Sequence, residues 1–355
     1  MFTSDFDYQL PREYIAQKPQ EPRDHSRLMV VDKGKKSVVH DSFFNLLQYL
    51  RPDDLLVWNN SRVFKARLFG ILEGGKGEEL WHGQKVEIFL IKPQENEGVW
   101  QVLGKPGRRL APGMRVRFAP DFFCDIMVKS RTGEILVQFS GLTAEQVRQK
   151  ANQYGHIPVP PYVKDEPHQL DIYQTVYARA EGSVAAPTAG FHFTPDLIEK
   201  IKKRGVQLAE ITLHVGLGTF LPVKAERVDD HVMHSEYVEL TAVNAELINQ
   251  AKKDGRRIIA VGTTTVRTLE GLAQQAGFHD QRLEPYQGEI NIFIRPGFSF
   301  QIIDGLITNF HLPRSTLLML VAAFAGDTKF VLDCYEEAKA KNYRFYSFGD
   351  AMFIY

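Results

Sequence analysis

Cysteine is scarce in this chain of 355 residues, which contains only Cys124 and Cys334. The two stand far apart without CxxC or zinc-type spacing, which argues against a disulfide framework and favours a reducing cytoplasm over secretion. Long apolar runs are missing too, since residues 317–325 fall far short of the ~18 residues of a membrane span. Asp5 and Asp7 stand where a signal peptide would be basic and then apolar. We therefore expect a cytoplasmic protein with no membrane partner.

An excess of one charge is also missing, because 43 Lys and Arg balance 43 Asp and Glu. A net charge of zero argues against a protein that binds nucleic acid over its whole surface. The charge is uneven, however, since residues 60–118 hold 11 Lys and Arg against 6 Glu and no Asp. Arg108, Arg109, Arg115 and Arg117 belong to this basic stretch. Such residues are either solvated loop residues or a face that contacts RNA phosphates without reading sequence.

Several familiar cofactor motifs are missing as well. The chain has no GxxxxGK[ST] phosphate loop and no GxSxG elbow. Gly216-Leu217-Gly218 begins like a dinucleotide fingerprint, but residue 221 is leucine and no acidic ribose anchor follows. His231 and His234 with Glu236 lack the HExxH pattern, which favours surface or hydrogen-bonded structural histidines. We expect no metal.

The spacing of strands and helices predicts a body with an insert. Between residues 63 and 139, short and often alternating β-branched runs are separated by Gly, Pro and Asn, which is typical of an antiparallel barrel or sandwich. From residue 165 onward strands alternate with helices, and a helix over 44–50 and a strand over 54–58 belong to the same α/β layer. The predicted domains are residues 1–59 and 156–355 as the α/β body and residues 60–155 as the β insert.

Four loops of unusual composition stand out. Residues 183–193 pack small residues, a proline, a glycine and a histidine ahead of a helix that starts at Thr194 and Pro195. Three more loops follow predicted strands, at residues 214–220, at 262–265 and at 308–315. In an open, largely parallel α/β sheet, such loops gather at the carboxyl ends of the strands, where ligands bind. One pocket would then collect His192, His214, Thr263, Arg267, Asn309 and His311.

Each of these side chains also has a structural interpretation. A histidine at a strand end is more often a satisfied core residue than a catalyst, although three histidines in converging loops favour function. The threonines at 263–265 could simply cap a helix. A helix N-terminus with exposed hydroxyls can also bind an anion. Arg267 and Glu270 lie one turn apart and could form an i, i+3 pair.

Seven segments spread over the whole chain carry a family resemblance: residues 59–63, 183–193, 213–222, 231–236, 261–270, 308–326 and 343–354. Through them the chain resembles the S-adenosylmethionine:tRNA ribosyltransferase-isomerases of queuosine biosynthesis. The resemblance implies an α/β/α sandwich body with a largely parallel sheet and an inserted antiparallel β-barrel. It implies transfer and rearrangement of the ribosyl group of S-adenosylmethionine onto 7-aminomethyl-7-deazaguanine at the wobble position of a tRNA with a GUN anticodon. Epoxyqueuosine forms in the tRNA, and adenine and methionine are released.

This chemistry needs proton transfer. The sulfonium acidifies the hydrogens on the adjacent ribose carbon, so a base must reach them, and an acid must protonate the departing adenine. Histidine suits either role near neutral pH, so the catalytic candidates are His192, His214 and His311. The predicted contacts of S-adenosylmethionine, the co-substrate, are Ala186, Pro187, Thr188, Gly190, Gly216, Gly218, Thr263, Thr264, Arg267 and Asn309. The predicted substrate-binding residues are Arg62, Arg108, Arg109, Arg115, Arg117, Ser315 and Asp350, of which Arg108, Arg109, Arg115 and Arg117 are the candidates for phosphate contacts with the tRNA.

Two other functions stay open. The first is another S-adenosylmethionine enzyme such as an RNA methyltransferase, whose product would be S-adenosylhomocysteine. The second is a non-catalytic RNA-binding module built on the basic insert, against which stands the cluster of His, Asn, Thr and Arg on loops far from that insert. We expect the protein to act as a monomer.

Overall fold

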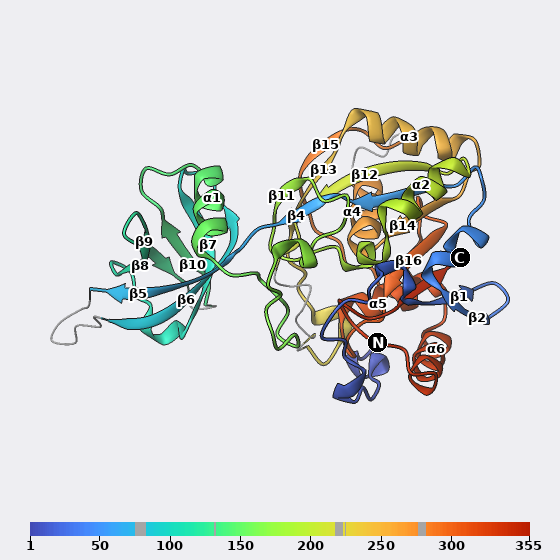
Figure 1. Cartoon of the computed structure of the whole chain (residues 1–355), viewed down its shortest axis with the longest axis horizontal. Helices are drawn as coiled ribbons and strands as arrows, with labels where there is room; N and C mark the ends of the chain where they lie inside the picture. Colours follow the sequence, from blue (N-terminus) through green and yellow to red (C-terminus); the bar gives the residue numbers. More distant parts are fainter. Residues whose placement is uncertain (75–82, 131–132, 217–222, 224, 276–281) are drawn as a thin grey trace.

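The computed structural model describes residues 1–74, 83–130, 133–216, 223, 225–275 and 282–355. In these residues the body is built on a sheet of nine strands (Figure 1). Their order across the sheet is β15 (Tyr286–Ile290), β13 (Glu236–Leu240), β12 (Gln207–Leu213), β3 (Leu55–Asn59), β14 (Ile258–Val261), β16 (Gly305–Asn309), β17 (Ala351–Ile354), β1 (Arg27–Asp32) and β2 (Ser37–Ser42). β12, β3, β14 and β16 run parallel at the centre, while antiparallel pairs form toward both margins.

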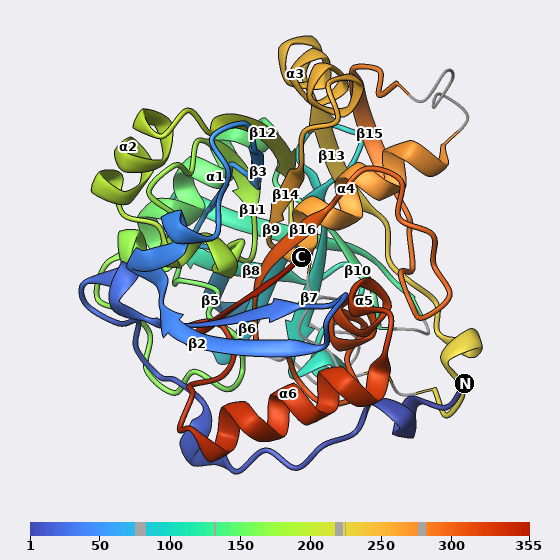
Figure 2. The ribbon, with the colours of Figure 1, turned by 90° about the vertical axis from the view of Figure 1, so that its right-hand side faces the viewer.

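The central strands are apolar on both faces because helices cover both. Every residue of β3 and β14 is buried, as expected for parallel strands inside an α/β sandwich. Leu55 and Val57 pack on one side with α3 (Ala242–Lys253), α4 (Thr263–Gln274), α5 (Thr316–Ala325) and α6 (Thr328–Ala340). Leu56 and Trp58 pack on the other side with α2 (Pro195–Lys203) and the 3-10 helix η4 (Phe43–Gln48). Figure 2 shows α2 on one side of the sheet and α4 and α5 on the other. The predicted α/β/α sandwich is confirmed.

The insert is a closed antiparallel barrel, also as predicted. Its strands are β5 (Arg67–Glu73), β6 (Gln84–Pro93), β7 (Val99–Lys105), β8 (Arg115–Ala119), β9 (Phe122–Lys129) and β10 (Ile135–Gln138), and they close in the order β10–β7–β6–β5–β8–β9. Helix α1 (Ala144–Tyr154) begins with Thr143 as its N-cap, in a capping box with Gln146. This helix buries Val147 and Ala151 in the core of the barrel, so it belongs to the same unit.

A short ribbon joins the two parts, and it corrects the strand expected from residue 63 onward. β4 (Ser61–Val63) pairs in parallel with β11 (Ala180–Ser183), and β5 begins only at Arg67. Val63 packs in a cluster of body residues, whereas Phe64 packs in the barrel core. The chain therefore changes domain between these two residues. A second correction concerns the helix expected over 44–50, which is the 3-10 helix η4.

The route of the chain puts the barrel on one particular side of the body. β3 ends at Asn59 and leads directly into β4 and the barrel. Since β3 is parallel to β12 and β14, the barrel lies beyond the carboxyl ends of these strands (Figure 1). This is the edge at which ligands bind in open α/β sheets.

Candidate active site

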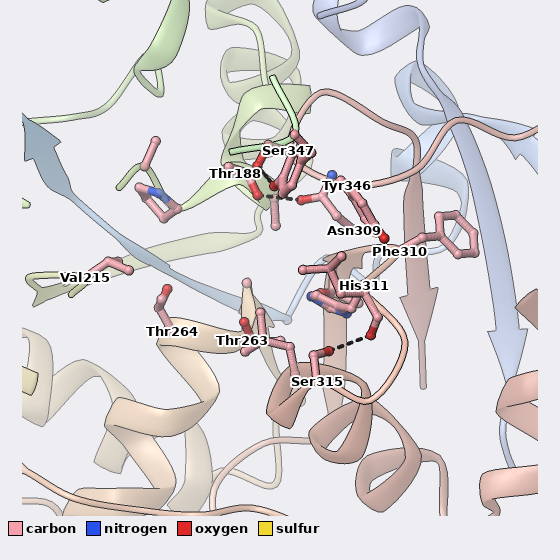
Figure 3. Close-up of a pocket in the computed structure, with 18 residues that line it drawn as sticks. Thr188, Val215, Thr263, Thr264, Asn309, Phe310, His311, Ser315, Tyr346 and Ser347 are labelled. Carbon is pink, nitrogen blue, oxygen red and sulfur yellow. Dashed lines mark hydrogen bonds between the residues drawn. The ribbon is translucent and has the colours of Figure 1, made fainter. Parts of the chain in front are cut away.

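A cavity with roughly 630 Å³ of empty space, part of it open to solvent, lies at this carboxyl edge (Figure 3). Four stretches at or after the strand ends line it, together with two tyrosines and a serine from two other segments. The lining residues are Val215; Gly262, Thr263 and Thr264; Thr308 to Leu312 with Ser315 and Leu317; Ala186 to Ala189; and Tyr162, Tyr346 and Ser347. The predicted convergence of loops at the strand ends is thus present.

The structure brings together eight of the predicted site residues on the cavity wall. They are Ala186, Pro187, Thr188, Thr263, Thr264, Asn309, His311 and Ser315. Predicted residues that the described lining does not include are Gly190, His192, His214, Gly216, Arg267, Arg62, Asp350 and the four barrel arginines. Gly218 lies outside the described residues.

The start of α4 forms one wall of the cavity. Gly262 precedes the helix with φ of 88°, a conformation that favours glycine. Thr263 and Thr264 occupy the first turn, where backbone N–H groups have no intrahelical acceptor and the helix dipole favours negative charge. Thr265 instead turns its hydroxyl to the carbonyl of Val261, at 2.7 Å. This wall suits an anionic group such as a carboxylate.

His311 is the predicted catalytic histidine that lines the cavity. Its backbone N–H donates to the hydroxyl of Tyr335 at 3.1 Å, and its carbonyl accepts from Tyr8 at 2.5 Å. The ring Nε2 lies 3.4 Å from the hydroxyl of Thr308, whereas Nδ1 has no hydrogen-bond partner among the described residues. Burial lowers the pKa of His311 to about 3. The ring is therefore neutral near pH 7 and offers one free nitrogen.

His192 lies directly behind the cavity wall. It is buried, and its Nε2 lies 3.1 Å from the side-chain nitrogen of Asn309, which does line the cavity. Its Nδ1 lies 2.7 Å from the hydroxyl of Ser26. Burial, together with the positive charges of Arg344 and Arg23, lowers the pKa of His192 to about 3. His192 thus reaches the cavity through Asn309.

His214 faces away from the cavity. Its neighbour Val215 contributes to the described lining, and successive side chains of an extended segment point to opposite sides. The ring of His214 stacks on Tyr237, with centroids 5.5 Å apart, and lies against Gly182. Burial, with a smaller effect of Arg148, lowers the pKa of His214 to about 4. The three histidines therefore do not meet in one pocket.

Arg267 lies one turn along α4 from the cavity. Its guanidinium pairs with Glu236, and both side chains are buried. Glu236 also accepts from the backbone N–H of Gly216, at 3.3 Å. The i, i+3 neighbour Glu270 binds the backbone N–H groups of residues 301–303 at 2.8–3.0 Å instead. Arg267 and Glu236 hold α4 against the end of β12 and the start of β13.

The predicted substrate-binding residues lie in several environments. Arg115 forms a bidentate pair with Asp125 (2.7 and 2.9 Å), and Arg117 forms one with Glu73 (2.6 and 3.1 Å). Arg62 pairs with Asp171 at 3.3 Å.

The other predicted residues are held by hydrogen bonds or lie on a turn. The carboxylate of Asp350 accepts from the backbone N–H groups of Arg27 and Arg344. The hydroxyl of Ser315 caps α5 and donates to the carbonyl of Leu312. Arg108 and Arg109 lie on the short 3-10 helix η5 (Gly107–Arg109) after β7.

Sequence reasoning missed an aromatic part of the lining. Tyr162 and Tyr346 have ring centroids 4.7 Å apart, and the hydroxyl of Tyr162 lies 2.7 Å from that of Ser347. Tyr346 and Ser347 belong to residues 343–354, one of the segments that carry the family resemblance. This resemblance was the one signal in the sequence that could have indicated them as site residues. Tyr162 lies on the return from the barrel to the body, where no pattern indicated a site.

The fold and the cavity together define an α/β protein with a candidate small-molecule site at the carboxyl edge of its sheet, on the side from which an inserted β-barrel extends. The family model described as "Queuosine biosynthesis protein" matches residues 3–354, and the chain belongs to this family. It is 51% identical over 356 residues to a protein of Carboxydothermus hydrogenoformans and 48% identical over 354 residues to one of Thermotoga petrophila, with all of each chain covered. Both relatives are named S-adenosylmethionine:tRNA ribosyltransferase-isomerase.

A solved structure agrees with this assignment. The crystal structure of the S-adenosylmethionine tRNA ribosyltransferase from Thermotoga maritima is similar, with 38% identity and a TM-score of 0.56. The match covers 99% of this chain and 100% of that one. Among the described residues, no helix is long and apolar enough to cross a membrane, and no three or more His, Cys, Asp or Glu side chains are grouped as metal ligands would be.

Proposed function

We propose that this chain is a ribosyltransferase-isomerase that transfers the ribosyl group of S-adenosylmethionine to 7-aminomethyl-7-deazaguanine in tRNA. Epoxyqueuosine-tRNA, adenine and methionine are the products. Relatives of this name match the chain from end to end. The observation that carries the proposal is the position of the cavity, which lies at the sheet edge from which the barrel extends. A small substrate and a large one can therefore approach the same place from two domains.

The cavity offers groups for two parts of S-adenosylmethionine and for one proton transfer. The first turn of α4, with Thr263 and Thr264, suits the methionine carboxylate. The paired rings of Tyr162 and Tyr346 offer apolar surface for the adenine. His311 lines the same cavity, its Nδ1 has no hydrogen-bond partner among the described residues, and it is our candidate for the proton transfer that opens the reaction.

The barrel supplies the tRNA side of the proposal. Arg115 and Arg117 are neutralised by their carboxylate partners. Lys105, Arg108 and Arg109 take part in none of the ion pairs found among the described residues of the barrel, and they lie at and just after the end of β7. We assign the phosphate contacts to this turn. The tRNA carries a GUN anticodon, and the enzyme acts as a cytoplasmic monomer.

One incubation tests the reaction itself. S-adenosylmethionine labelled in the ribose is mixed with the protein and with tRNA that carries 7-aminomethyl-7-deazaguanine, and the nucleosides and small products are analysed by mass. We expect labelled epoxyqueuosine with equal amounts of adenine and methionine, and no product from tRNA with an unmodified wobble guanine. Formation of S-adenosylhomocysteine would instead identify a methyltransferase, and tRNA binding without any product would identify a binding module.

A further inference from the structure

A chain of hydrogen bonds runs from the interior of the body to the cavity wall. The hydroxyl of Ser26, at the start of β1, lies 2.7 Å from Nδ1 of His192. Nε2 of the same ring lies 3.1 Å from Nδ2 of Asn309, at the end of β16. The hydroxyl of Thr188 donates to Oδ1 of Asn309 at 3.0 Å (Figure 3). Thr188 and Asn309 line the cavity, whereas Ser26 and His192 are buried behind them.

The surroundings of Asn309 fix the orientation of its amide. Nδ2 also lies 3.5 Å from the backbone carbonyl of Asp350, which can only accept a hydrogen bond. The opposite orientation would place two oxygens against each other there. The side of the amide that faces His192 is therefore the N–H side, and Oδ1 faces Thr188.

This orientation also fixes the proton on His192. Because the Asn309 amide donates, Nε2 must carry the lone pair and Nδ1 must carry the hydrogen, which it donates to Ser26. A doubly protonated ring would place an N–H of His192 against an N–H of Asn309. The charged groups that act on the ring from other elements are Arg23 and Arg344, which oppose a positive charge there. The nearby carboxylate of Asp350 already accepts from two backbone N–H groups.

We propose that His192 is a positioning residue, not a proton carrier, and that Ser26 and His192 together orient Asn309 so that its carbonyl oxygen and the Thr188 hydroxyl form one fixed polar wall of the cavity. This inference rests on the proposed function for its kinetic consequences only. The wall presents a hydrogen-bond acceptor, so it recognises a donor of the bound nucleoside, such as an amine or a ribose hydroxyl. Without the imidazole, Nδ2 of Asn309 keeps only the long 3.5 Å contact with the carbonyl of Asp350 and loses the shorter one at 3.1 Å. The amide is then held less firmly, and its carbonyl oxygen and its NH₂ group can exchange places.

Nuclear magnetic resonance of protein labelled with ¹⁵N in its histidines tests the proton assignment without any substrate. We expect the His192 ring to show a protonated Nδ1 and an unprotonated Nε2 from pH 5.5 to 8, with no titration. The signal is identified by its loss in His192→Gln. A protonated Nε2, or a titration within this range, would overturn the proposal whether or not the chain is a ribosyltransferase.

A double-variant cycle tests the coupling to Asn309. His192→Leu removes the acceptor and should lower kcat about 10- to 100-fold, the loss expected when a buried partner is left unsatisfied. Asn309→Ala should cost a similar factor, and the double variant should be no worse than Asn309→Ala alone. If the kcat loss of the double variant equals the product of the two single losses, His192 acts independently of Asn309 and the proposal is overturned.

Two further variants keep the test valid if His192→Leu does not fold. His192→Gln retains an acceptor for the Asn309 amide and should recover most of kcat, which a proton carrier replaced by glutamine would not. Ser26→Ala removes the group that holds Nδ1 and should lower kcat by about 2- to 10-fold with the pH profile unchanged. A shifted pH profile in Ser26→Ala would contradict the proposal. His168→Gln, at an exposed histidine, is the matched control.

Discussion

Gly182 lies directly against the imidazole of His214: a Cβ at residue 182 would lie 2.6 Å from Nε2 of the ring. Gly182 belongs to β11, the strand that pairs with β4 where the chain enters the barrel, and His214 follows the end of β12. The ribbon between the two domains and the edge of the main sheet therefore fit together only because one residue lacks a side chain. His214 is part of this joint rather than of the cavity wall.

The first prediction follows from this contact. Gly182→Ala forces the added methyl group into the ring of His214 and should lower the free energy of unfolding by about 1–3 kcal/mol, as overpacking does. Urea denaturation measures the loss. Adding His214→Ala to the same chain removes the clash, so the double variant should be less destabilised than the sum of the two single variants. A simple sum would show that the contact is not the cause.

The second prediction concerns pH and follows from the buried neutral ring of His192. Burial holds its pKa at about 3, whereas an unfolded histidine titrates near 6.5. Below pH ~6.5 the unfolded chain therefore binds a proton that the folded chain does not, and stability falls as the pH falls. Between pH 7 and 5 this one ring should cost about 2 kcal/mol of unfolding free energy. His192→Gln should show a correspondingly shallower fall in denaturation curves at these two pH values. Equal slopes would contradict a neutral, buried His192.

The third prediction separates two residues of α4. Thr264→Val removes a hydroxyl from the cavity wall and should weaken S-adenosylmethionine binding about 2- to 10-fold in calorimetry, with Thr264→Ser as the control. Arg267→Met breaks a buried ion pair with Glu236 and should lower the free energy of unfolding by about 3–5 kcal/mol. The opposite pattern, with Arg267→Met affecting only affinity, would restore Arg267 as a direct ligand of the substrate.

The sequence predicted the architecture well because its signals were local. The strands expected before the loops at residues 214–220, 262–265 and 308–315 are β12, β14 and β16, and the short β-branched runs expected between residues 63 and 139 form the barrel. The cavity loops were also found, because glycine-rich ends of parallel strands share one edge. The direction in which a single side chain points was not predictable. His214 was expected in the pocket and turned out to face Tyr237, since a shift of one residue moves a side chain to the opposite face.

Ion-pair partners that lie far apart in the sequence could not be predicted either. Nothing near Arg115 or Arg117 in the sequence indicates which carboxylate each binds, because Asp125 and Glu73 meet them only across the barrel strands. From composition alone, both arginines were expected to offer a positive charge that could bind RNA phosphates. The structure shows that each is neutralised by a bidentate partner.

The last prediction locates the tRNA contacts. Lys105, Arg108 and Arg109 form a basic turn without described ion pairs, and Lys129 fixes the turn by donating to the carbonyls of Gly107 and Leu110 at 2.7 and 3.1 Å. Changing the three free residues to glutamine should weaken tRNA binding. The slope of the logarithm of the binding constant against the logarithm of the salt concentration should flatten by about 0.7–0.9 for each lost phosphate contact, while S-adenosylmethionine affinity stays unchanged.

Two matched variants decide whether the basic turn is the cause. Replacing Arg115, Asp125, Arg117 and Glu73 by Gln, Asn, Gln and Gln removes two whole ion pairs without changing the net charge of the barrel, so the salt slope should stay the same. Lys203 and Arg204 are exposed at the end of α2, where the chain turns back into the amino end of β12. That edge of the sheet is opposite the cavity, so reversing both charges should also leave the slope unchanged. A flatter slope in this body variant, with no change in the turn variant, would place the tRNA along the body instead of the barrel.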